Sequence, residues 1–285
     1  QEENFIQDLA IRLLKLRATY GFSGTAQTSY SPLPIIYYQG NDYLTGYPYA
    51  DITSPSNQNL GWERIKTINL AADIGLFNNR LNATFEWYRK HSMDLISSTP
   101  LDPSTGYETM IMNGGYLLAK GFDIQIRTAN IQNLSFRWNT SLLLNKNRNI
   151  VKEYHYVWPR ASDYVLNSGS AGSNFLKGYD VGAVFAYGSK GLDSEGDPVG
   201  YLNGQESKDY MNIRLQSTKD DLRYFGTGIP VWNGSLRNEF GFGRFCLSIN
   251  IQTRLGFYFF RSSFNQQSFA QRRYELGLLS TIDLL

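Results

Sequence analysis

The sequence predicts an all-β fold built from long antiparallel strands. Three observations point to it: apolar and polar residues alternate strictly along several stretches, each stretch continues for about ten residues or more, and short connections alternate with long ones. Aromatic residues make up 15% of the 285 residues and 26 residues are glycine, a mixture typical of strands that end in tight turns. Charged residues make up 18%, which is too low for a disordered chain.

The stretch from Lys66 to Leu76 shows the alternation most clearly, with apolar residues at every second position. After the turn pair Asn78-Asn79 the pattern resumes from Leu81 to Lys90, so the two runs predict a hairpin. The same reasoning applied to the later strands assigns an apolar set and a polar set to opposite faces of one sheet. The apolar set is Leu70, Ile74, Phe85, Ile124, Leu247 and Ile249, and the polar set is Asn69, Asp73, Glu86, Asp123, Asn250 and Gln252.

Two further hairpins are predicted downstream. One runs from Phe122 to Leu142 with a turn at 130–133, and the other runs from Trp232 to Leu255 with a turn at 241–243. Single alternating runs at 14–20 and 274–284 bring the total to about eight clear strands, and we expect about eight to ten long strands in all.

Strand length and connection length together favour a membrane barrel over a soluble sheet. Soluble strands average ~5–6 residues, whereas tilted barrel strands need ~9–11. The turns near residues 78, 131 and 242 are tight, and barrels of the outer membrane have short periplasmic turns and long extracellular loops. The long loops are expected at about 21–63, 92–114, 147–228 and 257–271.

Aromatic residues fall where this orientation places the two membrane interfaces, so we expect two aromatic girdles. The alternative is that aromatic residues simply favour strands. The expected outer girdle is Tyr20, Trp87, Tyr88, Phe257 and Tyr258, and the expected inner girdle is Phe77, Phe136, Phe240, Phe242 and Phe245.

Charge and reactive side chains indicate neither a nucleic-acid partner nor an enzyme. The formal net charge is only +2, so no global field attracts nucleic acid. Cys246 is the only cysteine, which rules out an internal disulfide and a multi-thiolate metal site. His91 and His155 are the only histidines and lie far apart in sequence, so we expect no catalytic residue, no metal and no cofactor.

Several strings in the chain resemble the SusC-like (SusC/RagA) TonB-dependent transporters of Bacteroidota. The resemblance covers most of the chain, in order. It rests on KLRATYGFSGT at 15–25, NQNLGWERIKTINLAADIGLFNNRLNATFEWYRKHSMDLI at 57–96, NGGYLLAKGFDIQI at 113–126, WNTSLLLNKN at 138–147, GYDVGAVFAYGSKGLDSEGDP at 178–198 and TGIPVWNGSLRNEFGFGRFCLSINI at 227–251.

This resemblance implies a 22-stranded outer-membrane barrel with an N-terminal plug, a segment that binds TonB, and a SusD-like lipoprotein lid that delivers glycans or peptides. The plug, the TonB-binding segment and the early strands have no counterpart in this sequence. We therefore expect residues 1–285 to form a partial barrel domain that lacks the plug and the terminal strands, with both ends lying inside a longer protein.

Candidate contacts to substrate or lid lie in the predicted outer loops. Tyrosines crowd the 21–63 loop, where rings can stack on sugar faces or pack against a lid; packing among themselves is the alternative. The string GLDSEGDP resembles a calcium loop but fails its spacing, which favours an ordinary turn. The candidate residues are Tyr37, Tyr38, Tyr43, Tyr47, Asp193 and Asp197.

The sequence is best interpreted as the barrel part of an outer-membrane TonB-dependent importer for glycans or peptides that works with a SusD-like lipoprotein, contacts outer-membrane lipid and binds TonB through the missing plug. Two alternatives remain. A structural or adhesin-like outer-membrane barrel shares the two-faced strands, and a soluble glycan-binding β-protein accounts for the tyrosines but predicts shorter strands.

Overall fold

The computed structural model describes residues 11–25, 30–165 and 175–260, and it divides into two compact units. The first unit comprises Gln1–Tyr156, Leu176–Tyr179 and Val231–Leu255, and the second comprises Val157–Phe175, Asp180–Pro230 and Gly256–Leu285.

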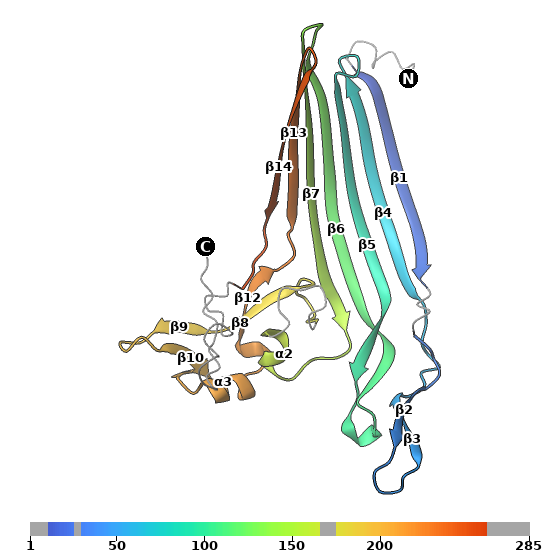
Figure 1. Ribbon diagram of the computed structural model, residues 1–285, viewed down its shortest axis with the longest axis vertical. Coiled ribbons are helices and arrows are strands. Elements are labelled where there is room, and N and C mark those ends of the chain that lie inside the picture. The colour runs from blue at the N-terminus through green and yellow to red at the C-terminus, as the bar shows by residue number, and fades with distance from the viewer. Residues whose placement is uncertain (1–10, 26–29, 166–174, 261–285) are drawn as a thin grey trace. The chain divides into compact units, whose positions relative to one another are not determined.

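The first unit is built on one seven-stranded antiparallel sheet, which Figure 1 shows as long strands lying side by side. The strands are long enough to cross a bilayer, since the longest has 24 residues and the shortest have 11. Within the described residues, the first and last strands are the edges of an open sheet. In sheet order the strands are β1 (Ile11–Thr25), β4 (Glu63–Leu76), β5 (Leu81–Pro100), β6 (Thr109–Gln132), β7 (Phe136–Tyr154), β13 (Trp232–Phe242) and β14 (Phe245–Leu255).

The strand register confirms the predicted assignment of faces. Residues directly opposite one another on neighbouring strands share a face. Phe85 of β5 lies opposite both Ala72 of β4 and Ile124 of β6, whereas Glu86 lies opposite Ala71 and Asp123. The same alternation continues through β7 and β13 to β14, so every member of the apolar set lies on one face and every member of the polar set lies on the other.

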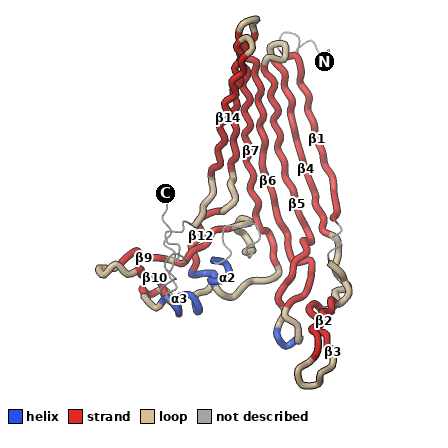
Figure 2. The backbone as a smooth tube through the Cα atoms, in the orientation of Figure 1, coloured by secondary structure: helices blue, strands red, loops and turns tan. Residues whose placement is uncertain are grey.

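The three short turns occur where the sequence predicts them, and they lie at the same end of the sheet (Figure 2). In the β4–β5 turn Phe77, Asn78 and Asn79 all have positive φ, a conformation that asparagine tolerates better than most residues. In the β6–β7 turn the side chain of Asn133 accepts hydrogen bonds from the backbone N–H groups of Ser135 and Phe136. Local side-chain chemistry therefore sets these connections.

The expected loop at 92–114 is wrong, because most of these residues continue the β5–β6 hairpin. β5 extends to Pro100 and β6 begins at Thr109, and a short 3-10 turn, η1 (Pro103–Thr105), connects them. The register shifts between Ser92 and Ile96, where Asp94 has a φ of 57°. Such a bulge interrupts the apolar–polar alternation, so the rest of the strand cannot be predicted from that pattern.

The expected loop at 21–63 is shorter and partly structured. β1 continues to Thr25 and β4 begins at Glu63. Between them lies a separate two-stranded ribbon, β2 (Ile35–Asn41) and β3 (Pro48–Ser54).

The expected loop at 147–228 is also wrong, because β7 continues to Tyr154 and the second unit is a small folded body. Its described elements bury Tyr164, Phe185 and Ile213, which form a core of their own. The elements are α2 (Ala161–Val165), β8 (Ala183–Tyr187), β9 (Ser189–Leu192), β10 (Pro198–Leu202), β11 (Gln205–Ser207), α3 (Tyr210–Gln216), η2 (Lys219–Asp221) and β12 (Leu222–Thr227). None of the helices in the described ranges is long and apolar enough to cross a membrane.

The remaining predictions at the C-terminal end fall largely outside the described residues. The predicted strand at 274–284 and most of the 257–271 loop belong to this undescribed part, so the described sheet has seven long strands against the eight to ten expected.

The expected outer girdle needs correction at three positions. Tyr88 lies opposite Asn69 and Gly121 and therefore belongs to the polar face. Phe257 and Tyr258 belong to the second unit rather than to a strand of the sheet.

Candidate functional site

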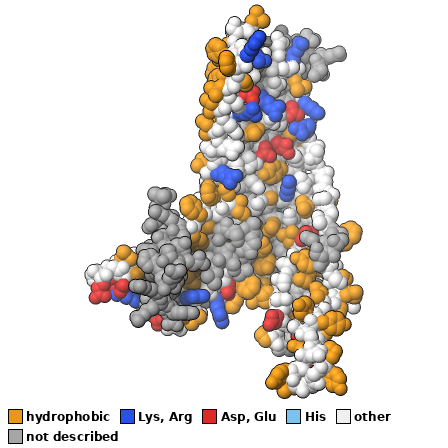
Figure 3. Space-filling model, in the orientation of Figure 1, with side chains coloured by type: hydrophobic (Ala, Val, Ile, Leu, Met, Phe, Trp, Pro, Cys, Tyr) orange, Lys and Arg blue, Asp and Glu red, His pale blue; other side chains and the backbone are white. Residues whose placement is uncertain are grey.

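The polar face of the sheet carries a network of hydrogen bonds and ion pairs. On the first strands Arg17 forms a salt bridge to Asp73, with 2.9 Å between Nε and Oδ2, and the Thr84 hydroxyl donates to Asp73 over 3.0 Å. Asn69 donates its amide to Glu86 over 2.5 Å. Figure 3 shows acidic and basic side chains gathered over the upper part of the sheet. The polar positions therefore hold one another in place rather than standing as isolated charges.

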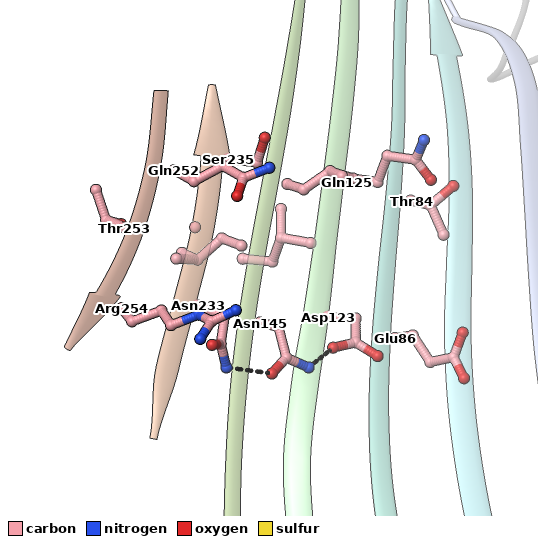
Figure 4. A pocket seen from close by; sticks show the side chains of 14 residues that line it. Thr84, Glu86, Asp123, Gln125, Asn145, Asn233, Ser235, Gln252, Thr253 and Arg254 are labelled. Atoms are coloured by element: carbon pink, nitrogen blue, oxygen red, sulfur yellow. Dashed lines mark hydrogen bonds between the residues drawn. The ribbon is translucent and has the colours of Figure 1, made fainter. Parts of the chain in front are cut away.

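A cavity of about 550 Å³ lies over the polar face of β5, β6, β7, β13 and β14. Figure 4 shows the side chains of Asp123, Asn145 and Asn233 in a row across three strands. Asn145 donates to Asp123, and Asn233 donates to Asn145 over 3.4 Å. Glu86, Gln252 and Arg254 complete the polar lining. Amides and a few charges offer many hydrogen bonds to a polar solute.

The asparagines of this row are functional candidates that the sequence analysis missed. The candidate residues predicted from the sequence are tyrosines and aspartates, and no amide is among them. Asn145 sits at an alternating position of β7, which is the available signal, but its contact with Asn233 spans 88 positions and cannot be read from local spacing.

Of the four candidate tyrosines, Tyr37 and Tyr38 lie in β2, and Tyr43 and Tyr47 lie in the turn that joins β2 to β3. Figure 1 shows this ribbon at the end of the sheet opposite the short turns. Asp42 organises the tip of this ribbon, because its carboxylate accepts the backbone N–H groups of Thr45 and Leu44 over 2.8 and 3.0 Å. These hydrogen bonds, that of Thr45 first, lower the pKa of the Asp42 carboxyl group. The exposed fractions are 61% for Tyr37, 79% for Tyr38, 99% for Tyr43 and 75% for Tyr47.

These exposures mean that the rings stand in solvent on an ordered ribbon. Tyr37 and Tyr38 are neighbours in β2 and therefore point to opposite sides of it, opposite Asp51 and Ala50 of β3. None of the ring contacts within the described residues joins the four tyrosines. Exposed aromatic rings on an ordered ribbon offer contact surface to a partner on either side of it.

The two candidate aspartates occupy a turn of the second unit together with Lys208. Asp193 accepts the backbone N–H groups of Glu195 and Asp197, each over 2.9 Å, which folds the turn. The Lys208 ammonium forms ion pairs with Asp193, with Asp197 at 3.0 Å and with Glu195 at 3.6 Å. The Lys208 ammonium group thus lies among the carboxylates that would bind the metal if this turn were a calcium loop.

The charges in this turn stabilise one another. The hydrogen bond from Lys208 and then the backbone N–H of Asp197 lower the pKa of Asp193 to about 2. The same contacts raise the pKa of the Lys208 ammonium group. The structure therefore brings Asp193 and Asp197 together in one turn and brings the tyrosines together on one ribbon, but the turn and the ribbon belong to different units.

Comparisons with known proteins identify relatives of the chain. No family model matches the chain. The chain is 27% identical, over 90% of its length, to TonB-dependent receptor P3 of Formosa agariphila, and it spans 27% of that protein. It is also 27% identical, over 70% of its length, to TonB-dependent receptor SusC of Bacteroides thetaiotaomicron, of which it spans 21%.

Solved structures show the same fold. The structure of the RagAB peptide transporter matches with a TM-score of 0.71 and 20% sequence identity, covering 89% of this chain and 28% of the other chain. The structure of the RagAB peptide importer in the 'open-open' state matches with a TM-score of 0.70 and 19% identity. The chain thus spans about a quarter of the proteins that it matches over most of its length.

Proposed function

This chain is related to the SusC-like TonB-dependent receptors, and we propose that it forms part of the barrel wall of an outer-membrane importer. The observation that carries the proposal is the two-faced sheet: strands of 11 residues or more present a continuous apolar face to lipid and a hydrogen-bonded polar face to the lumen. A structural barrel that carried no solute has no need for the polar cavity over Asp123 and Asn145.

The transport we propose needs no covalent chemistry by this chain. Outer segments capture the nutrient together with a SusD-like lipoprotein, and the solute then passes along the polar face as the plug moves. In this scheme TonB acts on the plug and drives that movement. Residues 1–285 in this scheme are a partial barrel domain without the plug and the terminal strands.

The substrate class that fits is a glycan or a peptide. Both carry many hydrogen-bonding groups, which the amides of Asn145 and Asn233 match, and both offer apolar faces for aromatic rings. The structurally similar RagAB complex is a peptide transporter, and this likeness supports the peptide alternative without excluding sugars.

We assign the capture of ligand or lid to the exposed ribbon. Tyr37, Tyr38, Tyr43 and Tyr47 present large rigid rings at low entropic cost, as in many binding surfaces. Asp193 and Asp197 supply hydrogen-bond acceptors from the second unit, with Asp197 the more available because half of its side chain is exposed.

An uptake experiment tests the proposal in the organism that encodes the complete receptor. Cells that lack the gene are expected to lose growth on the imported glycan or peptide and to grow normally on a monosaccharide. Restoring the complete gene restores growth, and restoring it without the TonB-binding segment does not. If growth never depends on the gene while attachment to a surface does, the adhesin-like alternative is correct.

A further inference from the structure

Three basic residues form one row across the apolar face of the sheet. Arg89 of β5 lies directly opposite Lys120 of β6, and Lys120 lies directly opposite Arg148 of β7. We call these three residues the cation row. All three side chains are exposed, and Ile68 of β4 continues the same row at its other side.

A row of like charges is unfavourable for the sheet itself. Like charges directly opposite one another on neighbouring strands are destabilising. Among the described residues, no acidic side chain forms a salt bridge with Arg89 or Lys120. The nearby acid Asp94 is already engaged, because it pairs with Arg64 at 2.5 Å. For Arg89 and Lys120, an anion from outside the chain can supply the compensation.

The position of the cation row along the strands indicates how deep in the membrane that anion would lie. One step along the strands toward the short turns, the same face carries Trp87, Phe122 and Trp232. The rings of Phe122 and Trp232 meet edge to face with centroids 5.6 Å apart, and the Lys146 Nζ lies 4.6 Å from the Trp232 ring centroid. Aromatic rows of this kind mark the boundary between hydrocarbon and headgroups.

The spacing to the other end of the sheet agrees with a bilayer. The rings of Trp138 and Phe240 stack with centroids 5.8 Å apart near the short turns. From Phe240 to Trp232 the strand rises by about 26 Å at ~3.3 Å per residue, or about 20 Å along the membrane normal for a tilt of ~40°. The cation row therefore lies just beyond the hydrocarbon, among the headgroups of one leaflet.

Further basic residues flank the row. Lys66 of β4 lies over the rings of Tyr20 and Phe22, at 5.2 and 5.8 Å from their centroids. Lys66, Arg89 and Lys152 all lie close enough to interact electrostatically with His91. By contrast, the apolar-face positions at the short-turn end of β7, β13 and β14 hold no charged residue among those described. On these three strands the basic residues of the apolar face, Lys146 and Arg148, both lie at the end opposite the short turns.

From these observations we propose that the cation row binds the phosphate groups of the glycolipid that forms the outer leaflet, namely the phosphorylated lipid A part of lipopolysaccharide. This assignment rests on the proposed function, which places the end of the sheet opposite the short turns at the cell exterior. Guanidinium and ammonium groups are suited to phosphate, and Arg89 can donate two parallel hydrogen bonds to one phosphate. Lys120, directly opposite Arg89, supplies a further donor.

The test uses the complete receptor, delipidated and placed in vesicles with phosphorylated lipid A or with the same lipid after enzymatic dephosphorylation. The variant is Arg89→Gln/Lys120→Gln/Arg148→Gln. The control is Lys90→Gln/Arg127→Gln/Arg137→Gln, which removes three cations from the same three strands but from the polar face. Bound lipid per protein is counted by native mass spectrometry, with inorganic phosphate alone as a second probe.

The parent and the control are expected to retain the phosphorylated lipid and to discriminate against the dephosphorylated one. The variant is expected to lose affinity by about fivefold for each cation removed. The single variant Arg89→Gln, with a smaller loss, covers the case in which the triple variant does not fold, and the shift of the unboiled band on a gel reports folding. Equal retention by variant and parent overturns the proposal, as does binding of inorganic phosphate without preference for the lipid.

The outcome is separable from that of the proposed function. Failure of import leaves the lipid count unchanged, whereas recovery of the parent receptor outside the outer membrane contradicts the proposed function before any lipid is counted. Loss of lipid with normal nutrient uptake supports this inference alone.

Discussion

Tyr88 on β5 fills the space that a side chain would occupy at its opposite neighbour, Gly121 on β6. A Cβ atom at Gly121 would lie 2.5 Å from the Tyr88 hydroxyl oxygen and closer still to the carbonyl oxygen of Lys146. The strand register places Tyr88 on the polar face rather than in the aromatic girdle, and the glycine opposite leaves room for its ring.

The first prediction follows from this contact. Gly121→Ala is expected to destabilise the complete receptor in lipid by about 1–3 kcal/mol, because the backbone oxygen of Lys146 cannot move aside as a flexible side chain can. Gly21→Ala is the control, since a Cβ atom at Gly21 meets nothing within 4 Å. Urea unfolding in vesicles measures both. An equal midpoint for the two variants contradicts the close packing of Tyr88 on Gly121.

The second prediction concerns the lipid-facing side of the sheet. Leu236 lies on β13 midway between Phe240 and Trp232, and Ile251 of β14 lies opposite it. Asn250, the neighbour of Ile251, lies on the polar face. Ile251→Arg is expected to destabilise the complete barrel in lipid by about 2–4 kcal/mol, because it places a charge near mid-bilayer. Asn250→Arg is expected to have a small effect. Similar unfolding free energies for the two variants count against a membrane-facing β14.

The depth of the charge supplies an internal check. Ile249 lies opposite Asn238, one step nearer the inner aromatic row than Ile251. Because the cost of a lipid-facing charge falls toward the interface, Ile249→Arg is expected to cost less than Ile251→Arg. The reverse order contradicts the placement of the two aromatic rows.

The predictable part of this fold is the part in which each residue's role depends on its near neighbours. The hairpin of β4 and β5 follows from alternation and from the turn residue Asn79, and its register follows because a slip of one residue exposes the whole apolar set. At Asp94 the bulge changes the phase, and the pattern no longer marks the strand that continues to Pro100.

The second unit was not predictable in the same way. Its buried strand β8 is continuously apolar and only five residues long, so it shows no alternation. Ile213 completes the core from a seven-residue helix that is too short to show a periodicity. Lys208 contacts Asp193 from the other side of the small sheet. No local sequence motif predicts this contact.

The third prediction concerns pH and the Lys208 turn. The pKa of Asp193 is lowered from 3.8 to about 2, so its ionised form stabilises the folded turn. A depressed pKa contributes stability that is present above the unfolded value and is lost as the pH falls through the folded value. Hydrogen-exchange protection of the peptide 193–208, corrected for intrinsic rates, is therefore expected to stay constant from pH 8 to pH 5 and to fall between about pH 4 and pH 2.

Asp193→Asn is the matched variant for this test, because it keeps the shape of the side chain and removes the charge. Its protection is expected to be lower than that of the parent at neutral pH and to change less in the acid range. Lys208→Gln is expected to weaken the turn at neutral pH as well. If the parent and the Asp193→Asn variant show the same acid transition, a group other than Asp193 is responsible for the pH dependence.

The last prediction concerns the exposed ribbon. In the complete receptor, replacing Tyr37, Tyr38, Tyr43 and Tyr47 together with alanine is expected to weaken binding of the nutrient or of the lipoprotein lid by about 1 kcal/mol or more, because tyrosines buried at an interface are frequent hot spots. The matched control replaces the same four residues with phenylalanine, which keeps the rings and removes only the hydroxyl groups. Titration calorimetry with the purified lid and with the nutrient separates the two partners. The Asp42 turn shapes the ribbon tip without these rings, so the alanine variant is expected to fold and insert normally. If that variant inserts and binds both partners as the parent does, the ribbon has a structural role and the capture site lies elsewhere on the receptor.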